Sequence, residues 1–392
     1  MKIIQNQQEI NITSHVKLAE TQLKDSKIYV VNTQNYIEHI AAYIAWTKVG
    51  GNIFVKSTIL PEKQSEILDE KISNYSYENS ICFHTSGTTG VPKLVVHTKE
   101  QMDSIALMAT KHMRWEENTR FLNFFPASTS GFWHIVLAPA LYNNSTIVLG
   151  SRETLIENLN EDVNYTILVP SLIDMIRMNN MPVDLSRVKR VGTGASAVSK
   201  RHAEILFSLG ATEVNQLYGA TEIGSPSLYK SSTSIDDYPD YLELKNTDIS
   251  EFKLVNNELY VKSKTLCVNY KDFSSDGEWF KTNDLWEQKG NLVKFAGRSN
   301  DIVKLNGYQC SLLLIESTIE NNTNLGEVLA IPRNKMGTDY IEVAYTNNTI
   351  INKQTLNSML ETHVPVYSIP RKYTYVESLP KTSLGKKIRN VL

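Results

Sequence analysis

The stretch that decides the fold is rich in glycine and hydroxyl side chains, and it reads Thr85-Ser86-Gly87-Thr88-Thr89-Gly90-Val91-Pro92-Lys93. Apolar runs at 81–83 and 94–96 flank it, so the sequence predicts a loop between two β-strands. Small residues let backbone N–H groups approach an anion closely, and Lys93 adds a positive charge. The loop differs from a Walker A loop, because that motif opens a helix and here a strand follows. We therefore favour a phosphate-binding loop over an ordinary glycine-rich hairpin.

Short β-rich runs alternate with helical stretches around this loop, which indicates layered α/β structure. Residues 28–55 are predicted to form a strand, an amphipathic helix and a second strand, which is one βαβ unit. Thr98 and Gln101 form a capping box that is expected to open the helix after the loop. A polar, turn-prone stretch then precedes a last segment of mixed helices and strands. We therefore predict two domains, 1–299 and 300–392.

The composition excludes several classes of protein. The chain has 392 residues, of which 41% are hydrophobic and 21% charged, as in soluble globular proteins with more than one core. Forty basic residues balance 42 acidic ones, so a dedicated nucleic-acid-binding protein is not expected. The three cysteines lie far apart, which disfavours disulfides and zinc and fits a reducing compartment. Because no apolar run reaches the length of a membrane span or resembles a signal peptide, we expect a cytoplasmic protein without a membrane span.

Three further motifs carry side chains suited to a nucleotide, and each is weak by itself. They are Gln216-Leu217-Tyr218-Gly219-Ala220-Thr221-Glu222, the pair formed by Lys281-Thr282-Asn283-Asp284 and 297–307, and the basic stretch 379–389. The first combines a ring that could stack on a base with a hydroxyl and a carboxylate that could hold a metal. A helix N-cap followed by a first-turn acid is the simpler explanation for it alone. The other two would otherwise be surface charges and a solvated chain end.

In this order the four motifs resemble those of the adenylate-forming superfamily, which contains acyl-CoA synthetases, adenylation domains of nonribosomal peptide synthesis and firefly luciferase. The resemblance runs from about Tyr36 to the C-terminus and lies in T-S-G-T-T-G-V-P-K, Y-G-A-T-E, T-N-D, G-R-S-N-D and L-P-K-T-S-L-G-K. It implies a large layered α/β N-terminal domain that binds AMP and a small mobile α+β C-terminal domain. It also implies an ATP-dependent, AMP-forming ligase.

The resemblance assigns a role to each matching residue. The ATP phosphates are expected at Thr85, Ser86, Gly87, Thr88, Thr89, Gly90 and Lys93. The adenine and the ribose are expected at Gly194, Ala195, Ser196, Gln216, Tyr218, Gly219, Asp284 and Arg298. Thr221 and Glu222 match the contacts to the α-phosphate and Mg2+, and Lys386 matches the lysine that bridges the carboxylate and the α-phosphate. The hinge and the thiol tunnel are expected at Asn300, Asn306 and Gly307.

The implied chemistry starts when a carboxylate attacks the anionic α-phosphate of ATP, so two like charges have to meet. Mg2+ and Lys386 would offset this repulsion, and losing one such preorganised charge costs about 10²–10³ in rate. Pyrophosphate leaves, an acyl-adenylate remains, and a thiol then displaces AMP. We expect the thiol of CoA, with the phosphopantetheine of a carrier protein as the alternative. A catalytically dead binding protein is a third hypothesis, which the presence of Lys93, Glu222, Asp284 and Lys386 together disfavours.

The segment 125–134 is expected to wall the acyl pocket. The residues expected to line it are Thr129, Phe132 and Trp133. Amino-acid-activating relatives carry an aspartate here that pairs with the substrate ammonium, but 121–150 contains no acidic residue. The two aromatic residues fit a plain core role equally well. His134 is expected to be a satisfied structural histidine, because adenylation needs no general base. The sequence therefore favours a fatty or aryl monocarboxylic acid.

Three departures from the superfamily pattern stand out. Asn300 occupies the hinge position, where Asp or Lys is usual, and Asn283 occupies a position that is usually glycine. We expect Asn283 to change the local backbone rather than the ribose contact. The phosphate loop begins at Thr85, earlier than in full-length relatives, so we expect a shortened N-terminal part.

Overall fold

The structure is a computed structural model, and it describes the chain except for residues 59, 61, 86–91, 152, 160–161, 196–197, 239–240, 270–277, 300–301, 306–307, 336–337, 350, 365, 382–386 and 390–392. The backbone contacts divide the chain into two compact units. The large unit contains Met1–Lys253 and Tyr260–Lys281, and the small unit contains Leu254–Leu259 and Thr282–Leu392. The fold is α/β with a separate, smaller C-terminal part, as the sequence predicts. The predicted boundary at Asn300 lies outside the described residues and stays a prediction.

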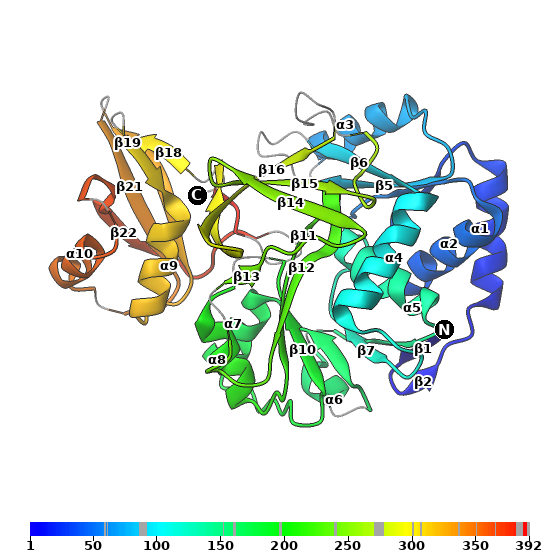
Figure 1. Cartoon of the computed structure of the whole chain (residues 1–392), viewed down its shortest axis with the longest axis horizontal. Helices are drawn as coiled ribbons and strands as arrows, with labels where there is room; N and C mark the ends of the chain where they lie inside the picture. The colour runs from blue at the N-terminus through cyan, green and yellow to red at the C-terminus, as the bar shows by residue number, and fades with distance from the viewer. Residues whose placement is uncertain are drawn as a thin grey trace. The chain divides into compact units, whose positions relative to one another are not determined.

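An eight-stranded sheet forms the centre of the large unit (Figure 1). Its strands follow the order β12 (Gly224–Ser232), β11 (Val214–Ala220), β10 (Arg190–Thr193), β9 (Tyr165–Ile167), β7 (Arg120–Asn123), β8 (Thr146–Leu149), β1 (Lys2–Gln5) and β2 (Gln8–Glu9). The six strands from β11 to β1 are parallel, whereas β12 and β2 run antiparallel at the two edges. The carboxyl ends of the parallel strands therefore meet at one edge, where α/β proteins bind their ligands.

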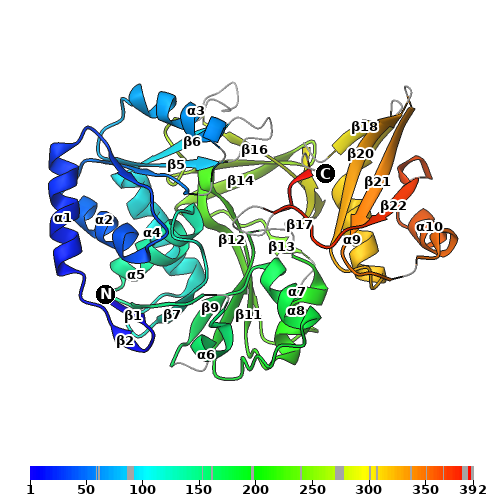
Figure 2. The same ribbon diagram turned by 180° about the vertical axis from the view of Figure 1, so that it is seen from behind.

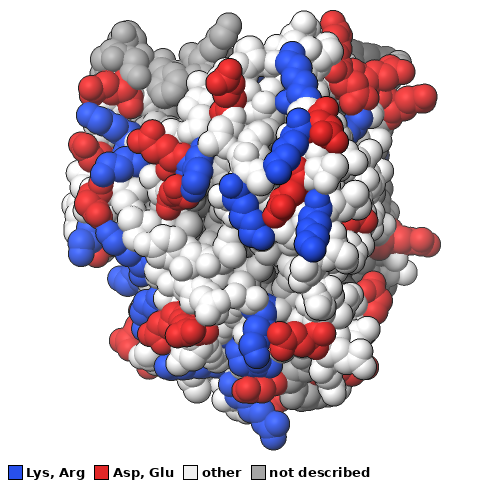
Figure 3. All heavy atoms as spheres, turned by 90° about the vertical axis from the view of Figure 1, so that its right-hand side faces the viewer, with Lys and Arg blue, Asp and Glu red and all other residues white. Residues whose placement is uncertain are grey.

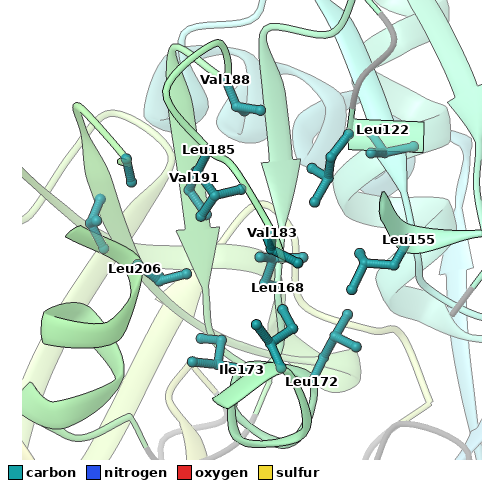
Figure 4. Packing of buried hydrophobic residues seen from close by; sticks show 14 of the residues in the cluster. Leu122, Leu155, Leu168, Leu172, Ile173, Val183, Leu185, Val188, Val191 and Leu206 are labelled. Atoms are coloured by element: carbon teal, nitrogen blue, oxygen red, sulfur yellow. The ribbon is translucent and has the colours of Figure 1, made fainter. Parts of the chain in front are cut away.

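Helices cover the two faces of this sheet. They are α4 (Lys99–Met113), α5 (Ala138–Tyr142), α6 (Leu155–Leu159), α7 (Pro170–Met178) and α8 (Lys200–Ser208). The apolar side chains of α7 and α8 pack with those of the sheet in one buried cluster, which includes Leu122, Leu172, Ile173, Val191 and Leu206 (Figure 4). Leucine and valine dominate the cluster, because strands that are covered on both faces need apolar side chains on both sides. This core holds the parallel strands rigidly under the edge where they end.

A second, four-stranded sheet of the large unit carries the glycine-rich loop. Its strands follow the order β3 (Tyr29–Val31), β4 (Asn52–Val55), β5 (Ser80–Thr85) and β6 (Lys93–Thr98). The helices of this part are α1 (Thr13–Asp25), α2 (Tyr36–Val49) and α3 (Glu62–Ser73), and α3 and α4 lie on opposite sides of the sheet (Figures 1 and 2). Strands β3 and β4 are parallel and α2 connects them, so the predicted βαβ unit is confirmed. The capping box of Thr98 and Gln101 is also present at the start of α4.

The remaining strands form smaller sheets. One sheet has the order β13 (Leu242–Glu243), β17 (Leu292–Arg298), β16 (Phe280–Lys289), β15 (Glu258–Ser263) and β14 (Ser250–Val255). The strands of this sheet are divided between the two units. The small unit contains the hairpin of β18 (Ile302–Leu305) and β19 (Tyr308–Ser311), and the sheet of β20 (Val328–Lys335), β21 (Thr338–Tyr345) and β22 (Lys372–Tyr375). Its helices are α9 (Leu312–Asn322) and α10 (Lys353–Glu361). Their apolar faces close a core around Ile315, Ile319, Val328, Ala330 and Val343.

The surface and the helices bear on two predictions from composition. Basic and acidic side chains are interspersed over the face shown in Figure 3, in keeping with the formal net charge of -2. Within the described part of the chain, every helix is too short or too polar to cross a lipid bilayer.

Candidate active site

The glycine-rich loop lies between β5 and β6, which pair antiparallel as the sequence predicts. Thr85 is the last residue of β5 and lies directly opposite Lys93, the first residue of β6. Lys71 of α3 donates a hydrogen bond of 2.7 Å to the carbonyl oxygen of Pro92, just before β6. These contacts fix both ends of the loop in register. The phosphate contacts predicted for Ser86, Gly87, Thr88, Thr89 and Gly90 lie outside the described residues.

The predicted adenine residues lie where two neighbouring parallel strands end. Thr193 of β10 pairs with Gln216 of β11, so Gly194 and Tyr218 both follow at the carboxyl edge of the sheet. A Cβ atom on Gly194 would lie 2.6 Å from the carbonyl oxygen of Leu217, which leaves space for glycine alone. Ala195 then adopts a φ of 67°, a left-handed conformation that alanine rarely takes. Such backbone strain gathers at functional sites, because surrounding structure has to hold it. Ser196 lies outside the described residues.

Strand β11 ends in an irregular segment that contains part of the motif 216–222. The pairing of β11 with β12 shifts register between Tyr218 and Ala220. At Gly219 a Cβ atom would lie 2.4 Å from the hydroxyl oxygen of Ser225. Gln216 is half-buried, and the Tyr238 hydroxyl donates a hydrogen bond of 3.2 Å to its side-chain oxygen. Position 219 therefore has no room for a side chain, and the hydrogen bond from Tyr238 orients the Gln216 amide.

Thr221 and Glu222 form a short 3₁₀ turn, Thr221–Ile223, that leads directly into β12. The alternative of an α-helix N-cap is therefore wrong for this segment, because a strand follows the turn. The backbone of the turn is anchored from two sides: the ring Nε2 of His97 lies 2.8 Å from the Thr221 carbonyl oxygen, and the Cys267 N–H donates to the Glu222 carbonyl oxygen at 2.9 Å. The motif thus has a fixed backbone at the carboxyl edge of the sheet.

Two neighbours of Thr221 escaped the sequence reasoning. The hydroxyl oxygens of Ser130 and Thr221 are 2.7 Å apart, which joins the predicted acyl segment to the predicted α-phosphate residue. His97 belongs to β6, the strand that leaves the glycine-rich loop. The sequence contains a signal for each of them. Ser130 is adjacent to Thr129, a predicted residue of the acyl pocket. His97 is a polar residue that directly follows the apolar run 94–96 of a buried strand.

The segment 125–134, which is predicted to wall the acyl pocket, contains side chains that are fully buried, whereas a pocket wall needs side chains that are exposed to the pocket. The side chains of Phe132 and Trp133 are inaccessible to solvent, and the Trp133 indole N–H donates a hydrogen bond of 3.0 Å to the Ala127 carbonyl oxygen. The rings of Tyr36, Tyr43 and Phe83 pack against them edge to face. The Thr129 hydroxyl donates to the carbonyl oxygen of Pro126 at 2.8 Å and closes a local turn. Their lining of an acyl pocket stays a prediction.

His134 differs from its expected state. It lies in a π-helix, Phe132–Leu137, and its ring meets that of His97 edge to face at 5.0 Å between centroids. Among the described residues neither ring nitrogen of His134 has a hydrogen-bond partner, so the prediction of a satisfied histidine is wrong. Burial holds the pKa of His134 well below its usual range and the nearby His97 adds to the effect, so the ring is neutral. Single turns of π-helix occur frequently at functional sites.

In the small unit, the structure brings the two predicted ribose residues together. Asp284 of β16 lies opposite Arg298 of β17, and the Arg298 Nε atom is 2.7 Å from a carboxylate oxygen of Asp284. The Asp284 side chain is only 2% exposed, so the guanidinium supports a buried charge. Asn283 adopts a φ of 60°, the left-handed conformation for which glycine is usual. Asparagine tolerates this conformation better than most residues, and the predicted change of the local backbone relative to a glycine stays a prediction.

The other predicted residues of the C-terminal part lie outside the described residues. They are Asn300, Asn306, Gly307 and Lys386. Their roles as hinge, thiol tunnel and catalytic lysine stay predictions.

The predicted Mg2+ ligand set consists of Glu222. Within the described part of the chain, no three His, Cys, Asp or Glu side chains gather as a metal cage would require. A single carboxylate nevertheless fits Mg2+, because this ion is commonly held by one or two carboxylates together with substrate phosphates and water.

Comparisons with known proteins bear on the family and on the fold. The sequence pattern of the family described as "AMP-binding enzyme" matches residues 54–264. Bacitracin synthase 3 of Bacillus licheniformis is 25% identical over 355 residues, which cover 81% of this chain and 6% of that protein. The 2-succinylbenzoate–CoA ligase of Staphylococcus epidermidis is 24% identical over 399 residues, covering 95% of this chain and 82% of the ligase. The structure of o-succinylbenzoate coenzyme A synthetase from Bacillus subtilis with ATP and magnesium has the same fold, with a TM-score of 0.82 at 18% identity over 100% of this chain and 96% of that one.

Proposed function

Because the chain belongs to the family of AMP-binding enzymes, we propose that it activates a carboxylic acid with ATP to an acyl-adenylate and transfers the acyl group to the thiol of CoA. Pyrophosphate is the product of the first step and AMP that of the second. The proposed substrate is a fatty or aryl monocarboxylic acid. The protein would then be an AMP-forming acyl-CoA ligase that works in the cytoplasm.

The observation that carries the proposal is the convergence of three segments on Thr221. His97, from the strand that leaves the glycine-rich loop, lies 2.8 Å from its carbonyl oxygen. Ser130, from the predicted acyl segment, lies 2.7 Å from its hydroxyl oxygen. Tyr218 belongs to β11, the strand that leads into Thr221, and Gly194 directly follows β10, the neighbouring parallel strand. The strand that follows the glycine-rich loop, the predicted acyl segment and the end of β11 thus all contact or contain residues of one turn, which supports a reaction that needs all three predicted parts close together.

Each side chain would contribute to the first step by position or by charge. A carboxylate oxygen attacks the α-phosphorus and the bond to pyrophosphate breaks. Glu222 would hold Mg2+, which when bound neutralises charge on the phosphates. Lys93 and Lys386 would supply fixed positive charge to the phosphates and to the pentavalent transition state. Tyr218 would stack on the adenine, and Asp284 would accept hydrogen bonds from the ribose hydroxyls.

The absence of acidic residues from 121–150 supports the choice of substrate. Burying an ammonium group without a counter-ion costs roughly several kcal/mol of free energy, because the group loses its hydration and gains no opposite charge in return. Thr129 and Ser130 offer hydroxyl groups, and both already contact other oxygen atoms of the protein. An uncharged hydrocarbon chain or ring avoids that cost.

The test is acid-dependent exchange of pyrophosphate into ATP over a panel of carboxylic acids. The panel contains straight-chain fatty acids, benzoate and phenylacetate derivatives, and the free amino acids. We expect exchange with at least one fatty or aryl acid. Faster exchange with any free amino acid would overturn the substrate class, and no exchange with any acid would overturn the proposed function.

One observation favours a second acceptor, the phosphopantetheine of a carrier protein. The chain matches bacitracin synthase 3 over 81% of its length but spans 6% of that much longer protein. The two acceptors are separated by measuring AMP release after adenylation with CoA or with a phosphopantetheinylated carrier protein. CoA-dependent release supports the proposal, whereas release with the carrier protein alone supports the second candidate.

A further inference from the structure

The short turn that carries the predicted α-phosphate and Mg2+ residues is held through its backbone. Each of its three consecutive carbonyl oxygens accepts a hydrogen bond from a residue outside the turn. The carbonyls belong to Thr221, Glu222 and Ile223, and their partners are, in the same order, His97, Cys267 and Thr265. Two of these partners use their side chains, His97 at 2.8 Å and Thr265 at 2.6 Å. All of these residues belong to the large unit.

His97 contacts the turn from a buried strand. It belongs to β6, the strand that leaves the glycine-rich loop, and it is inaccessible to solvent. Burial lowers the pKa of His97 to about 4, while the hydrogen bond to Thr221 opposes the shift, so the ring is neutral at physiological pH. A carbonyl oxygen can only accept a hydrogen bond, so the neutral ring carries its proton on Nε2. The rings of Phe83 and His134 pack against it edge to face, which restricts the direction of this N–H.

Thr265 is equally buried, and its hydroxyl group is the last in a chain of three. Distances of 2.7 Å join the hydroxyl oxygens of Ser250 and Ser263 and those of Ser263 and Thr265. A hydroxyl group has one proton to donate, so Thr265 donates to the Ile223 carbonyl oxygen and is left as the acceptor towards Ser263. The chain therefore orients the Thr265 hydroxyl group towards the turn.

The segment 265–269 also binds β6, so the strand and the turn form one hydrogen-bonded assembly. The Val268 N–H donates to the Val96 carbonyl oxygen, and the Asn269 side-chain oxygen accepts from the Val96 N–H, both at 2.9 Å. The turn is therefore connected to β6 twice, directly by His97 and indirectly through the segment 265–269.

We propose that His97 and Thr265 are positioning residues of the adenylation step, because they hold the turn that presents the Thr221 hydroxyl and the Glu222 carboxylate. The inference rests on the proposed function, in which these two side chains contact the α-phosphate and Mg2+. His97 and Thr265 are both inaccessible to solvent, so each acts through the backbone of the turn and not on a ligand. A misplacement of about 1 Å can cost about 10²-fold in rate, so loosening the turn slows the step even when both reactants bind.

The experiment pairs each loss of a donor with a variant that keeps one. His97→Leu and Thr265→Val remove the hydrogen bond but retain most of the bulk of the side chain, whereas His97→Gln and Thr265→Ser keep a donor. His39→Leu is the matched control. His39 of α2 is also inaccessible to solvent, and its Nε2 atom lies 2.9 Å from the carbonyl oxygen of Thr33, which is outside the predicted motifs. Burial lowers the pKa of His39 to about 4 as well.

We expect His97→Leu and Thr265→Val to lose about 10- to 100-fold in the kcat of pyrophosphate exchange with the most active acid of the panel, at an unchanged KM for the acid. His97→Gln and Thr265→Ser should restore most of the kcat. His39→Leu should lose as much stability in urea unfolding as His97→Leu and still keep the wild-type kcat. A wild-type kcat in both donor-free variants, no rescue by the variants that keep a donor, or an equal loss in the control would overturn the inference.

A double variant tests whether His97 acts through the turn. Thr221→Val removes the hydroxyl group and nearly keeps the shape of the side chain. His97→Leu should then reduce the kcat less in the Thr221→Val background than in the wild type, because one of the groups that it positions is already absent. Fully additive losses would show that His97 acts elsewhere.

A second readout needs no substrate and separates these hydrogen bonds from the proposed function. Hydrogen–deuterium exchange of the amides of 220–225 should be faster in His97→Leu and Thr265→Val than in the control His39→Leu. If the wild type exchanges pyrophosphate with no acid of the panel, the proposed function fails and the positioning role fails with it. Equal amide exchange in the donor-free variants and the control would show instead that the two side chains do not hold the turn.

Discussion

Replacing Gly194 by alanine should weaken ATP binding strongly, because a single methyl group would collide with the backbone beside the predicted adenine ring. The new Cβ atom would lie 2.6 Å from the Leu217 carbonyl oxygen, where ordinary contacts begin at 3.4 Å. The strand end therefore has to move by about 0.8 Å. The colliding atom belongs to the backbone, so no rotation of a side chain can relieve the contact. Tyr218 follows Leu217 in the chain, so it would move together with the Leu217 backbone.

The magnitude follows from these distances. Overpacking of this kind costs about 1–3 kcal/mol of folding stability. A displacement approaching 1 Å of a group that contacts the ligand should raise the Kd for ATP by about 10- to 100-fold. The assay is calorimetric titration of the variant with ATP and Mg2+, together with urea unfolding to measure the stability.

Gly192→Ala, two residues earlier in β10, is the matched control. Its Cβ would lie 2.7 Å from a side-chain carbon of Ile167, so this clash is with a side chain and not with the backbone beside Tyr218. This variant should lose stability by a similar amount but keep its affinity for ATP. An unchanged Kd for Gly194→Ala, or equal losses of affinity in both variants, would refute the placement of adenine at this strand end.

Three other changes test separate parts of the account. Lys386→Ala should lower pyrophosphate exchange by about 10²–10³-fold and spare thiol transfer from a supplied acyl-adenylate, since the lysine acts on the α-phosphate alone; equal loss in both half-reactions would refute its role. Asn283→Val should cost about 1–2 kcal/mol in urea unfolding, whereas Asn283→Gly should cost nothing, because φ is 60° there; equal costs would show that the backbone conformation is unimportant. Acid should destabilise the fold through His97, whose pKa is lowered to about 4, mainly by burial.

The sign of the acid effect follows from proton binding. Below the ordinary pKa of 6.5, the unfolded chain binds a proton at His97 that the folded chain does not bind until about pH 4. The contribution of His97 to stability is therefore complete above pH 6.5 and is lost as the pH falls towards 4. Each such histidine adds a slope of about 1.4 kcal/mol per pH unit in this window. His97→Gln should reduce the slope between pH 6.5 and 5 by that amount in urea unfolding, and an unchanged slope would contradict the assignment.

Local patterns predicted the layers of the fold well, because each signal acts over a few residues. The βαβ unit needs only an apolar run, a helix with a glycine stop and a second apolar run, and all three are present between residues 28 and 55. The antiparallel strands around the glycine-rich loop follow from two short apolar runs in the same way. The order of the motifs extends this reasoning to the residues that are predicted to bind the nucleotide.

The features that the sequence could not supply depend on contacts between distant segments. Ser130 and Thr221 are 91 residues apart, and no local pattern announces that their hydroxyl oxygens lie 2.7 Å from each other. Glu316 looks like an ordinary helix-surface charge in the sequence, although it is buried and pairs with Arg389. His134 was expected to have partners, because burial of a polar ring usually brings them, but ring contacts with Phe83 and His97 surround it instead.

The central claim, that the protein joins a carboxylate to the α-phosphate of ATP, is tested most directly by following oxygen. The most active acid of the panel is labelled with ¹⁸O in both carboxyl oxygens and incubated with the protein, ATP, Mg2+ and CoA. One labelled oxygen should form the bond to phosphorus, and thiol attack at the carbonyl carbon should leave it on AMP. Mass spectrometry should therefore find AMP carrying one ¹⁸O atom and a thioester carrying the other. Unlabelled AMP, or ADP in place of AMP, would contradict the formation of an acyl-adenylate.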